Sequence, residues 1–231
     1  MRTVAAWAVH AFTALGLVAA AGIAALVVEG GDVAFTRAFQ LMILATAIDA
    51  LDGPLARFAR VQETLPGFDG RRLDDLIDFL NYTCLPLLLI WRAGLLNGQP
   101  SWWLLFPLLA SAYGFSQADA KTEDGYFLGF PSYWNVVAFY LYFLKLDTWM
   151  SLGILVTLAL LTFVPLRYFY PTQPGLGNRV ACVLAAMWGG LVVVILIMPA
   201  ELRGPWLVTS LIFPLGYLVF SWWGHWRRAA S

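Results

Sequence analysis

The stretch from Asp49 to Asp78 reads DALDGPLARFARVQETLPGFDGRRLDDLID, and it places several acidic residues inside an otherwise apolar chain. Asp49 directly follows the apolar run 41–48, so its carboxylate is expected within a helix rather than beyond the end of one. Ionisable residues at membrane depth are costly to bury and are usually functional. The stretch therefore predicts a polar site built into membrane-embedded helices.

The composition supports a membrane-embedded chain. Of the 231 residues, 61% are hydrophobic and only 12% are charged, whereas soluble domains carry about a quarter charged residues. Aromatic residues make up 16%, including 11 Trp, which is typical of the belts at membrane interfaces. The net charge of zero gives no basic field for nucleic acid. We expect an all-α integral membrane protein with a single bundle of helices.

A membrane-spanning helix needs about 20 mostly apolar residues, and about eight candidates occur along the chain. They cover residues 4–28, 33–53, 73–96, 102–117, 133–144, 149–168, 179–198 and 205–226. The fifth is short, and we expect it to begin earlier, near Phe127. The Pro-rich break at 171–175 divides the chain into a six-helix core, residues 1–170, and two additional C-terminal transmembrane helices, residues 171–231.

The positive-inside rule predicts the orientation of these helices. With both termini in the cytoplasm, four of the 14 basic residues, Arg37, Arg92, Lys145 and Arg203, lie on the opposite side. The ten on the cytoplasmic side are Arg2, Arg57, Arg60, Arg71, Arg72, Lys121, Arg167, Arg179, Arg227 and Arg228. This bias predicts a multi-pass protein with both termini and the charged segment 54–72 in the cytoplasm.

The acidic residues fall into two pairs with helical spacing. Asp49 and Asp52 are three residues apart, and Asp74 and Asp78 are four apart, so each pair shares one face of its helix. Asp75 lies about 100° from Asp74 around the helix and is expected to point elsewhere. Solvated residues at the start of a helix would account for Asp74 and Asp75 alone, but not for Asp49 and Asp52, which follow a long apolar helix.

The segment 54–72 is expected to fold back as a short hairpin that brings the two pairs together. Each close pair of carboxylates costs on the order of 4 kcal/mol at an effective dielectric constant of about 20, so protons or divalent cations must neutralise the group. Oxygen ligands favour hard cations, here Mg²⁺ or Mn²⁺ rather than Ca²⁺. Gly53 and Ala56 would let a flat ligand approach the helix, and Arg57 adds a positive charge suited to phosphate.

The whole pattern, DxxDGxxARx₁₂GxxxDxxxD, resembles the signature of the CDP-alcohol phosphatidyltransferases. Most members of that family have a shorter spacer between the Arg and the second Gly than the twelve residues found here. The longer spacer, the eight expected spans and the run FLGFPSYWN at 127–135 are similar to the bacterial phosphatidylcholine synthases within that family. The resemblance implies a metal-dependent transferase of phospholipid biosynthesis in the bacterial inner membrane, with a cytoplasmic active site in its six-helix core, acting as a homodimer.

The resemblance also implies a role for each residue of the pattern. Two divalent cations, Mn²⁺ or Mg²⁺, would hold the pyrophosphate of CDP-diacylglycerol. Their ligands would be Asp49, Asp52, Asp74 and Asp78. The cytidine and phosphate pocket would be lined by Gly53, Ala56, Arg57 and Gly70. Asp78 would also be the catalytic general base, which takes the hydroxyl proton of the acceptor choline before its oxygen attacks phosphorus and CMP leaves.

The quaternary ammonium of choline is usually held in an aromatic cage by cation–π attraction. The candidates are Tyr82, on the same helix face as Asp78, and three residues near cytoplasmic helix ends: Tyr113, Tyr133 and Trp134. Tyr82, one turn beyond Asp78, is the first choice, with Tyr113 and Trp134 as further choline-binding residues. An additional anion could come from Asp119 or Glu123. Arg167 is the candidate contact for the lipid phosphate.

Two alternatives remain open. The first keeps the chemistry but uses serine, inositol or glycerol 3-phosphate as the acceptor; a phosphorylated acceptor would need more basic residues than the chain offers near the acids. The second is a secondary transporter with intramembrane acids. Transporters often repeat a broken helix in two matching halves, whereas the Asp-Gly-Pro break at 52–54 occurs once in this chain.

Overall fold

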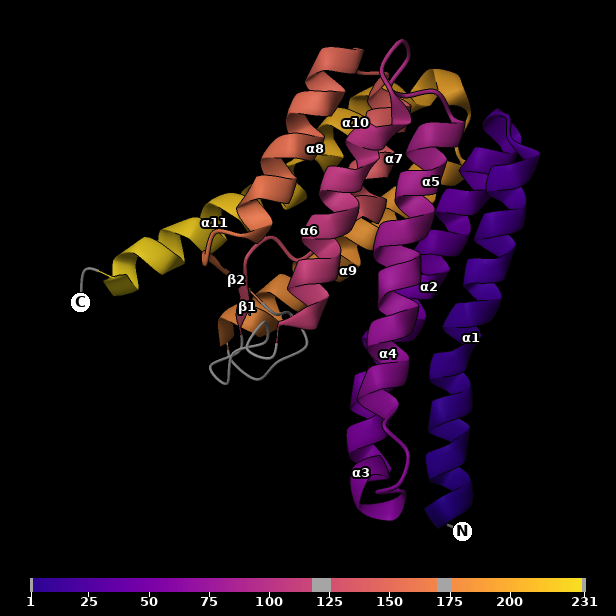
Figure 1. The fold of residues 1–231 in the computed structure, drawn as a ribbon, viewed down its shortest axis with the longest axis vertical. Coiled ribbons are helices and arrows are strands. Elements are labelled where there is room, and N and C mark those ends of the chain that lie inside the picture. The colour runs from indigo at the N-terminus through magenta and orange to yellow at the C-terminus, as the bar shows by residue number, and fades with distance from the viewer. Residues whose placement is uncertain (1, 118–125, 170–175, 230–231) are drawn as a thin grey trace.

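A long antiparallel helical hairpin forms one side of the molecule (Figure 1). In this computed structural model, which describes residues 2–117, 126–169 and 176–229, the hairpin consists of α1 (Arg2–Glu29) and α2 (Asp32–Phe58). Gly30 makes the turn with a positive φ of 76°, a conformation that favours glycine. Small residues let the two helices approach closely: a Cβ on Gly22 would lie 2.8 Å from a methyl carbon of Leu41.

A second helical rod packs against this hairpin. The chain returns from α2 through the short α3 (Val61–Thr64) into α4 (Gly70–Asp78), which continues as the π-helix η1 (Phe79–Cys84) and then as α5 (Leu85–Arg92). At the end of η1 the backbone amide of residue 85 donates to the carbonyl of residue 80, five residues earlier. The expected span 73–96 is therefore helical as far as residue 92, with a π segment in its middle that the sequence pattern did not predict.

Three shorter α-helices and one 3-10 helix follow among the described residues. The 3-10 helix η2 (Ser101–Leu104) leads into α6 (Leu105–Ser116), and α7 (Trp134–Leu144) and α8 (Thr148–Thr162) come later in the chain. α6 packs against α8, and α5 packs against α7. The core between these helices and the α1–α2 hairpin is rich in aromatic residues; for example, the Phe39 ring on α2 meets rings of α7. This core fixes the position of α2, on which two of the acidic residues lie.

A small antiparallel sheet corrects the expectation for the fifth span. It pairs β1 (Tyr126–Leu128) with β2 (Arg167–Phe169). The prediction that the fifth span begins near Phe127 is wrong, because this residue lies in β1 and α7 begins only after the following turn. Gly129 has a φ of 81°, and Pro131 lacks the amide hydrogen that a helix needs. These two residues end the strand and delay the helix.

The sixth expected span, 149–168, is also shorter than predicted. Helix α8 ends at Thr162, and Pro165 follows within one turn. Proline just beyond a helix end prevents its continuation. The remaining residues form β2 instead, which returns the chain to β1.

The C-terminal part consists of α9 (Leu176–Ile197), the 3-10 helix η3 (Ala200–Leu202), α10 (Arg203–Ser210) and α11 (Ile212–Ala229). α9 packs against α2, α10 against α7, and α11 against β2. The expected span 205–226 is thus divided into two helices at Leu211. In Figure 1, α11 leads away from the other helices toward the C-terminus.

The protein is an all-α membrane protein apart from its small sheet. Among the described residues, four helical stretches are long and apolar enough to cross a membrane: Arg2–Glu29, Asp32–Phe58, Gly177–Ile197 and Ala200–Gly224. Large apolar side chains point outward from them, for instance Val18, Met187 and Val219, which are 62–68% exposed. An apolar outer surface of this extent is suited to lipid. The total of eight spans stays a prediction, because the other helices are shorter or interrupted.

Candidate functional site

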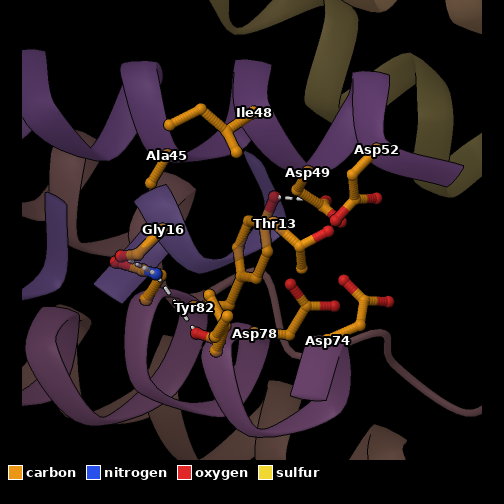
Figure 2. Close-up of a pocket in the computed structure, with 11 residues that line it drawn as sticks. Thr13, Gly16, Ala45, Ile48, Asp49, Asp52, Asp74, Asp78 and Tyr82 are labelled. Carbon is orange, nitrogen blue, oxygen red and sulfur yellow. Dashed lines mark hydrogen bonds between the residues drawn. The ribbon is translucent and has the colours of Figure 1, made fainter. Parts of the chain in front are cut away.

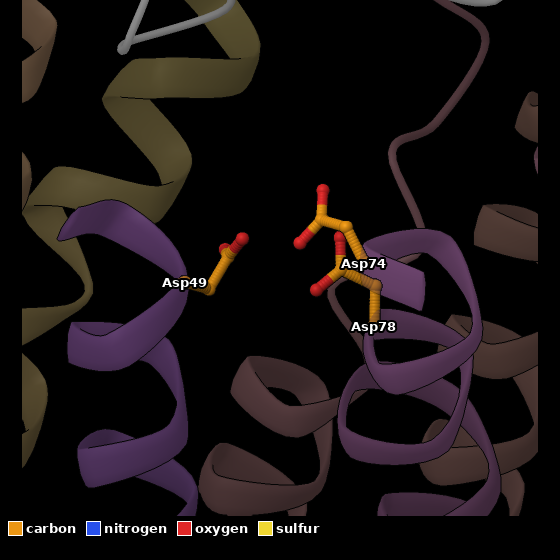
Figure 3. A group of neighbouring side chains, drawn as sticks. All are labelled: Asp49, Asp74 and Asp78. Carbon is orange, nitrogen blue, oxygen red and sulfur yellow. The ribbon is translucent and has the colours of Figure 1, made fainter. Parts of the chain in front are cut away.

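Four acidic side chains converge between α2 and α4 (Figure 2). Asp49 and Asp52 come from α2, and Asp74 and Asp78 face them from α4. Carboxylate oxygens of Asp49, Asp74 and Asp78 all lie within 4.8 Å of one another (Figure 3). The oxygen ligands of one hard cation lie up to about 4–5 Å apart, because each is about 2.0–2.6 Å from the metal. The three carboxylates therefore fit a divalent cation.

Asp52 lines the same pocket but is not part of the group of three. Its side chain lies beside Asp49 in Figure 2, and the residue is only 7% exposed. A carboxylate that is buried to this degree is stable only when its charge is compensated, which a cation between the two helices would do. Asp75 is not among the described residues that line the pocket, in keeping with its predicted place on another face of α4.

Tyr82 lines the pocket and contacts Asp49 directly. Its hydroxyl donates a 2.7 Å hydrogen bond to Asp49 Oδ2, one of the dashed lines in Figure 2. The residue lies in η1, and π-helical segments of this kind occur often at functional sites because they change the direction of the side chains that follow. A hydrogen bond to a metal-binding carboxylate fixes the orientation of that ligand.

Helix α1 closes the pocket from a third side. Thr13 and Gly16 line it, and Asn81 Nδ2 donates to the Gly16 carbonyl oxygen at 3.1 Å, which ties α1 to η1. Helices α1 and α4 approach closely here, because a Cβ on Gly16 would lie 2.5 Å from Ile77 Cγ2. Sequence reasoning missed these residues. The one available signal in the sequence was the spacing of the polar Thr13 and the small Gly16, which lie three positions apart on one face of an apolar helix.

The start of α7 is fastened beside the pocket. Asn135 Nδ2 donates to Thr46 Oγ1 at 3.4 Å, and Thr46 lies on α2 just before Asp49. Two residues before Asn135, Tyr133 brings its ring to the Tyr82 ring with a centroid distance of 6.4 Å. Tyr82, which lines the pocket, thus contacts a second aromatic ring that lies outside the described lining.

The small residues of the pattern extend from the pocket toward the end of α2. A Cβ on Gly53 would lie 3.4 Å from Arg57 Nη1, so the guanidinium folds back over the glycine that follows Asp52. Arg57 is exposed and Ala56 is half-buried. Helix α2 continues through Pro54 to its end at residue 58. The only basic side chain of the pattern thus lies next to the acids and open to an approaching phosphate.

Gly70 is required by helix packing. A Cβ at this position would lie 2.5 Å from His10 Cε1, because α1 crosses the start of α4 here. His10 is 6% exposed, and its ring centroid is 4.4 Å from that of Phe68 and 5.8 Å from that of Trp7. Nucleotide contact by Gly70 stays a prediction, and the close contact with His10 is a second reason for glycine at this position.

Two of the predicted choline residues are not among the described residues that line the pocket. Trp134 is fully buried, and its indole Nε1 donates to Ser111 Oγ at 2.6 Å. Tyr113 is 44% exposed on α6, with its ring centroid 4.8 Å from that of Phe163. Of the three, the structure brings only Tyr82 to the acids. The choline roles of all three stay predictions.

The remaining predicted contacts are placed as follows. Arg167 is half-buried on β2, where it pairs with Leu128. Its contact with a lipid phosphate stays a prediction. Asp119 and Glu123 lie outside the described residues.

Several curated relatives cover most of the chain. A Borreliella burgdorferi protein named phosphatidylcholine synthase is 33% identical over 169 residues, which are 73% of this chain and 71% of the relative. A Pseudomonas aeruginosa protein of the same name is 38% identical over 170 residues, 72% of this chain and 69% of the relative. A third, from Legionella pneumophila, is 39% identical over 176 residues and 73% of this chain.

The match does not extend over the full length of these relatives. The chain spans 66% of the Legionella pneumophila protein and 64% of a Legionella bozemanae protein with the same name, just under two thirds. No protein-family model matches the chain.

Proposed function

The chain belongs to the phosphatidylcholine synthase family, and we propose that it transfers the phosphatidyl group of CDP-diacylglycerol to choline and releases CMP. The observation that carries the proposal is the convergence of Asp49, Asp74 and Asp78 from two helices. Phosphoryl transfer asks little covalent chemistry of a protein but requires phosphates to be positioned and their charge compensated. The name of the relatives supports choline as the acceptor.

The residues of the pocket fit a divalent cation, Mn²⁺ or Mg²⁺. In the proposal the ligands are Asp49, Asp74 and Asp78, with Asp52 beside them for a second ion. Bound cations would hold the pyrophosphate and compensate the charge that develops on it. The Tyr82 hydroxyl holds the Asp49 carboxylate in place through its 2.7 Å hydrogen bond. The carboxylate-only donor set supports hard cations over zinc or copper.

Asp78 is the proposed general base. It lies beside Asp74 and faces Asp49 across the pocket (Figure 3), and its carboxylate takes the hydroxyl proton of choline. The choline oxygen then forms a bond to the phosphorus that carries diacylglycerol. The bond from that phosphorus to the CMP oxygen breaks, and its electron pair leaves with CMP, while the proton passes from Asp78 to solvent. A positioned base of this kind accelerates a reaction by about 10²–10⁴-fold.

The nucleotide half of the substrate is assigned to the end of α2. Arg57 lies against Gly53 with its guanidinium exposed, and a guanidinium suits the paired oxygens of a phosphate. Gly53 and Ala56 leave the helix surface low enough for a flat base to approach. Gly70 completes this pocket in the proposal.

The membrane arrangement that we propose is a bacterial inner-membrane protein with eight spans, acting as a homodimer. Residues 1–170 form the six-helix catalytic core, and residues 171–231 add two C-terminal spans. The N-terminus and α3 lie at the same end of the molecule in Figure 1. The segment 54–72, which includes α3, contains Arg57, Arg60, Arg71 and Arg72. This placement supports a cytoplasmic position for both the N-terminus and the active site.

Acceptor competition tests the proposal. The purified protein in detergent receives CDP-diacylglycerol and Mn²⁺ with labelled choline, serine, inositol or glycerol 3-phosphate in turn, and Asp78→Asn is run beside it. We expect label in lipid with choline alone, and none with Asp78→Asn. Label from another alcohol would keep the enzyme class and reject choline. Absence of CMP release with every alcohol would contradict an enzyme and favour a transporter.

A further inference from the structure

Three tyrosines from distant parts of the chain form a continuous aromatic surface, which we call the tyrosine wall: Tyr82 of η1, Tyr133 before α7 and Tyr217 of α11. The Tyr82 and Tyr133 ring centroids are 6.4 Å apart with planes inclined by 66°. The Tyr133 and Tyr217 centroids are 6.2 Å apart with planes inclined by 60°. Inclined rings at this spacing allow one cation to lie within about 6 Å of two neighbouring centroids at once, the range of cation–π attraction.

The tyrosine wall begins at the reaction site. Tyr82 lines the acid pocket, and its hydroxyl reaches Asp49 at 2.7 Å. None of the described residues that line this pocket is basic, and four are acidic. A cationic headgroup next to Tyr82 would therefore meet an aromatic ring and no repelling side chain among the described lining residues of the pocket.

Tyr133 is held by a strained turn. Ser132 directly before it is 3% exposed and has a φ of 56°, a left-handed conformation that few residues other than glycine adopt. The turn is closed by a 2.8 Å hydrogen bond from the Trp134 amide to the Ser132 carbonyl. Strain of this kind persists only where the surroundings over-determine it, and it concentrates at ligand sites. Tyr133 is thus presented in a fixed position.

Tyr217 is held by the small sheet. Its hydroxyl donates to the Phe169 carbonyl oxygen on β2 at 2.8 Å. Trp222 Nε1 donates to the Tyr168 hydroxyl at 3.0 Å, and the Tyr168 ring stacks near Tyr217 at a centroid distance of 6.3 Å. These contacts fasten α11 to β2, so the C-terminal helix delivers its tyrosine to the same surface as Tyr82.

We propose that the tyrosine wall is the headgroup subsite of the acceptor, and that α11 takes part in choosing a quaternary ammonium through Tyr217. The inference rests on the proposed function, since it assigns the acceptor end of that reaction. Among the residues of the wall, the C-terminal helices contribute a ring that the acid-bearing helices do not supply. A headgroup with fewer methyl groups would lose contact with these rings and would bind less well.

Truncation of one ring tests the inference. Tyr217→Leu is expected to raise the KM for choline about 2- to 30-fold, the value of one cation–π contact, without a matching change in the KM for CDP-diacylglycerol. Tyr217→Phe keeps the ring and should stay within about 2-fold of the parent protein. Phe220→Leu is the matched control, because it removes a ring that is 62% exposed on the same helix.

A probe without a hydroxyl separates binding from transfer. Tetramethylammonium should inhibit competitively against choline, and its Ki should rise with Tyr217→Leu in proportion to the KM. Equal loss of activity in Tyr217→Leu and Tyr217→Phe, with the KM for choline and the KM for CDP-diacylglycerol unchanged in each, would overturn the inference. Tyr217 would then have only a structural role. Where Tyr217→Leu does not fold, Tyr133→Leu applies the same test from the turn before α7. Choline transfer by the parent protein, measured first, shows whether a failure concerns this subsite or the proposed reaction itself.

Discussion

The acid face, formed by Asp49, Asp52, Asp74 and Asp78, meets the tyrosine wall at Tyr82, but the two regions are built in different ways. The acid face comes from two helices close together in the sequence, and helical spacing alone sets which carboxylates point inward. The tyrosine wall gathers one residue from each of three elements far apart in the chain, and it exists only once η1, α7 and α11 have packed. In the proposed function the reaction chemistry is thus encoded locally, while recognition of the acceptor depends on the tertiary fold.

The largest expected effect comes from replacing Asp74, with the neighbouring Asp75 replaced separately as a control. Asp74→Asn removes a carboxylate from the group of three. Loss of even an indirect partner of a metal costs about 10–100-fold in activity or affinity, so loss of a ligand should lower phosphatidyl transfer by more than about 100-fold. The rate of CMP release at saturating Mn²⁺ measures it.

Asp75→Asn is the control on the same helix, with the same change of charge. It should stay within about 3-fold of the parent protein, because Asp75 is not among the described residues that line the pocket. Equal losses in the two variants would mean that general charge near the membrane, rather than the geometry between α2 and α4, supports activity.

The residue shared by the two regions allows their roles to be separated. Tyr82→Phe removes the hydroxyl that holds Asp49 but keeps the ring. We expect the Mn²⁺ concentration for half-maximal activity to rise about 10- to 100-fold, with little change in the KM for choline. Tyr140→Phe, which removes a hydroxyl bonded to Ser210 in the core, is the control. A higher choline KM with unchanged Mn²⁺ dependence would assign the hydroxyl to the acceptor instead.

A packing change at the edge of the acid face should have a moderate effect on stability. Gly70→Ala places a methyl group 2.5 Å from His10 Cε1 and should lower the free energy of unfolding by about 1–3 kcal/mol, the usual cost of overpacking. In a His10→Ala background the same change should cost much less, since the contact is gone. Thermal unfolding in detergent of all four proteins gives the coupling energy. Absence of coupling would show that Gly70 is needed only for the ligand.

Helical periodicity explains why the acid site was predictable. Asp49 and Asp52, and Asp74 and Asp78, each keep a spacing that a helix converts into a shared face, and the hairpin between the pairs is too short to separate them. The convergence of Asp49, Asp74 and Asp78 follows from these local rules. The reason for Gly70 was harder to predict, because its neighbour His10 belongs to another helix.

Long-range packing explains what the sequence did not reveal. The π segment after Asp78 has no distinct residue signature, yet it contains Tyr82. Phe127 and Tyr168 were expected at the ends of apolar helices, but Gly129, Pro131 and Pro165 interrupt those helices and leave the two residues paired in a sheet. Tyr217 gave no signal at all, since only the packing of α11 on that sheet brings it to Tyr133.

The smallest predicted effect concerns an aromatic residue beside the tyrosine wall. Trp134 is fully buried and donates to Ser111 Oγ at 2.6 Å, so it packs between α6 and α7. Trp134→Phe should lower the free energy of unfolding by about 1 kcal/mol through loss of this hydrogen bond, and Ser111→Ala in the same chain should recover part of it because no polar group is then left unpaired. The KM for choline, measured with both variants, should not change. A choline KM that rises while stability is kept would extend the acceptor subsite to Trp134 and make the tyrosine wall only one side of a larger cage.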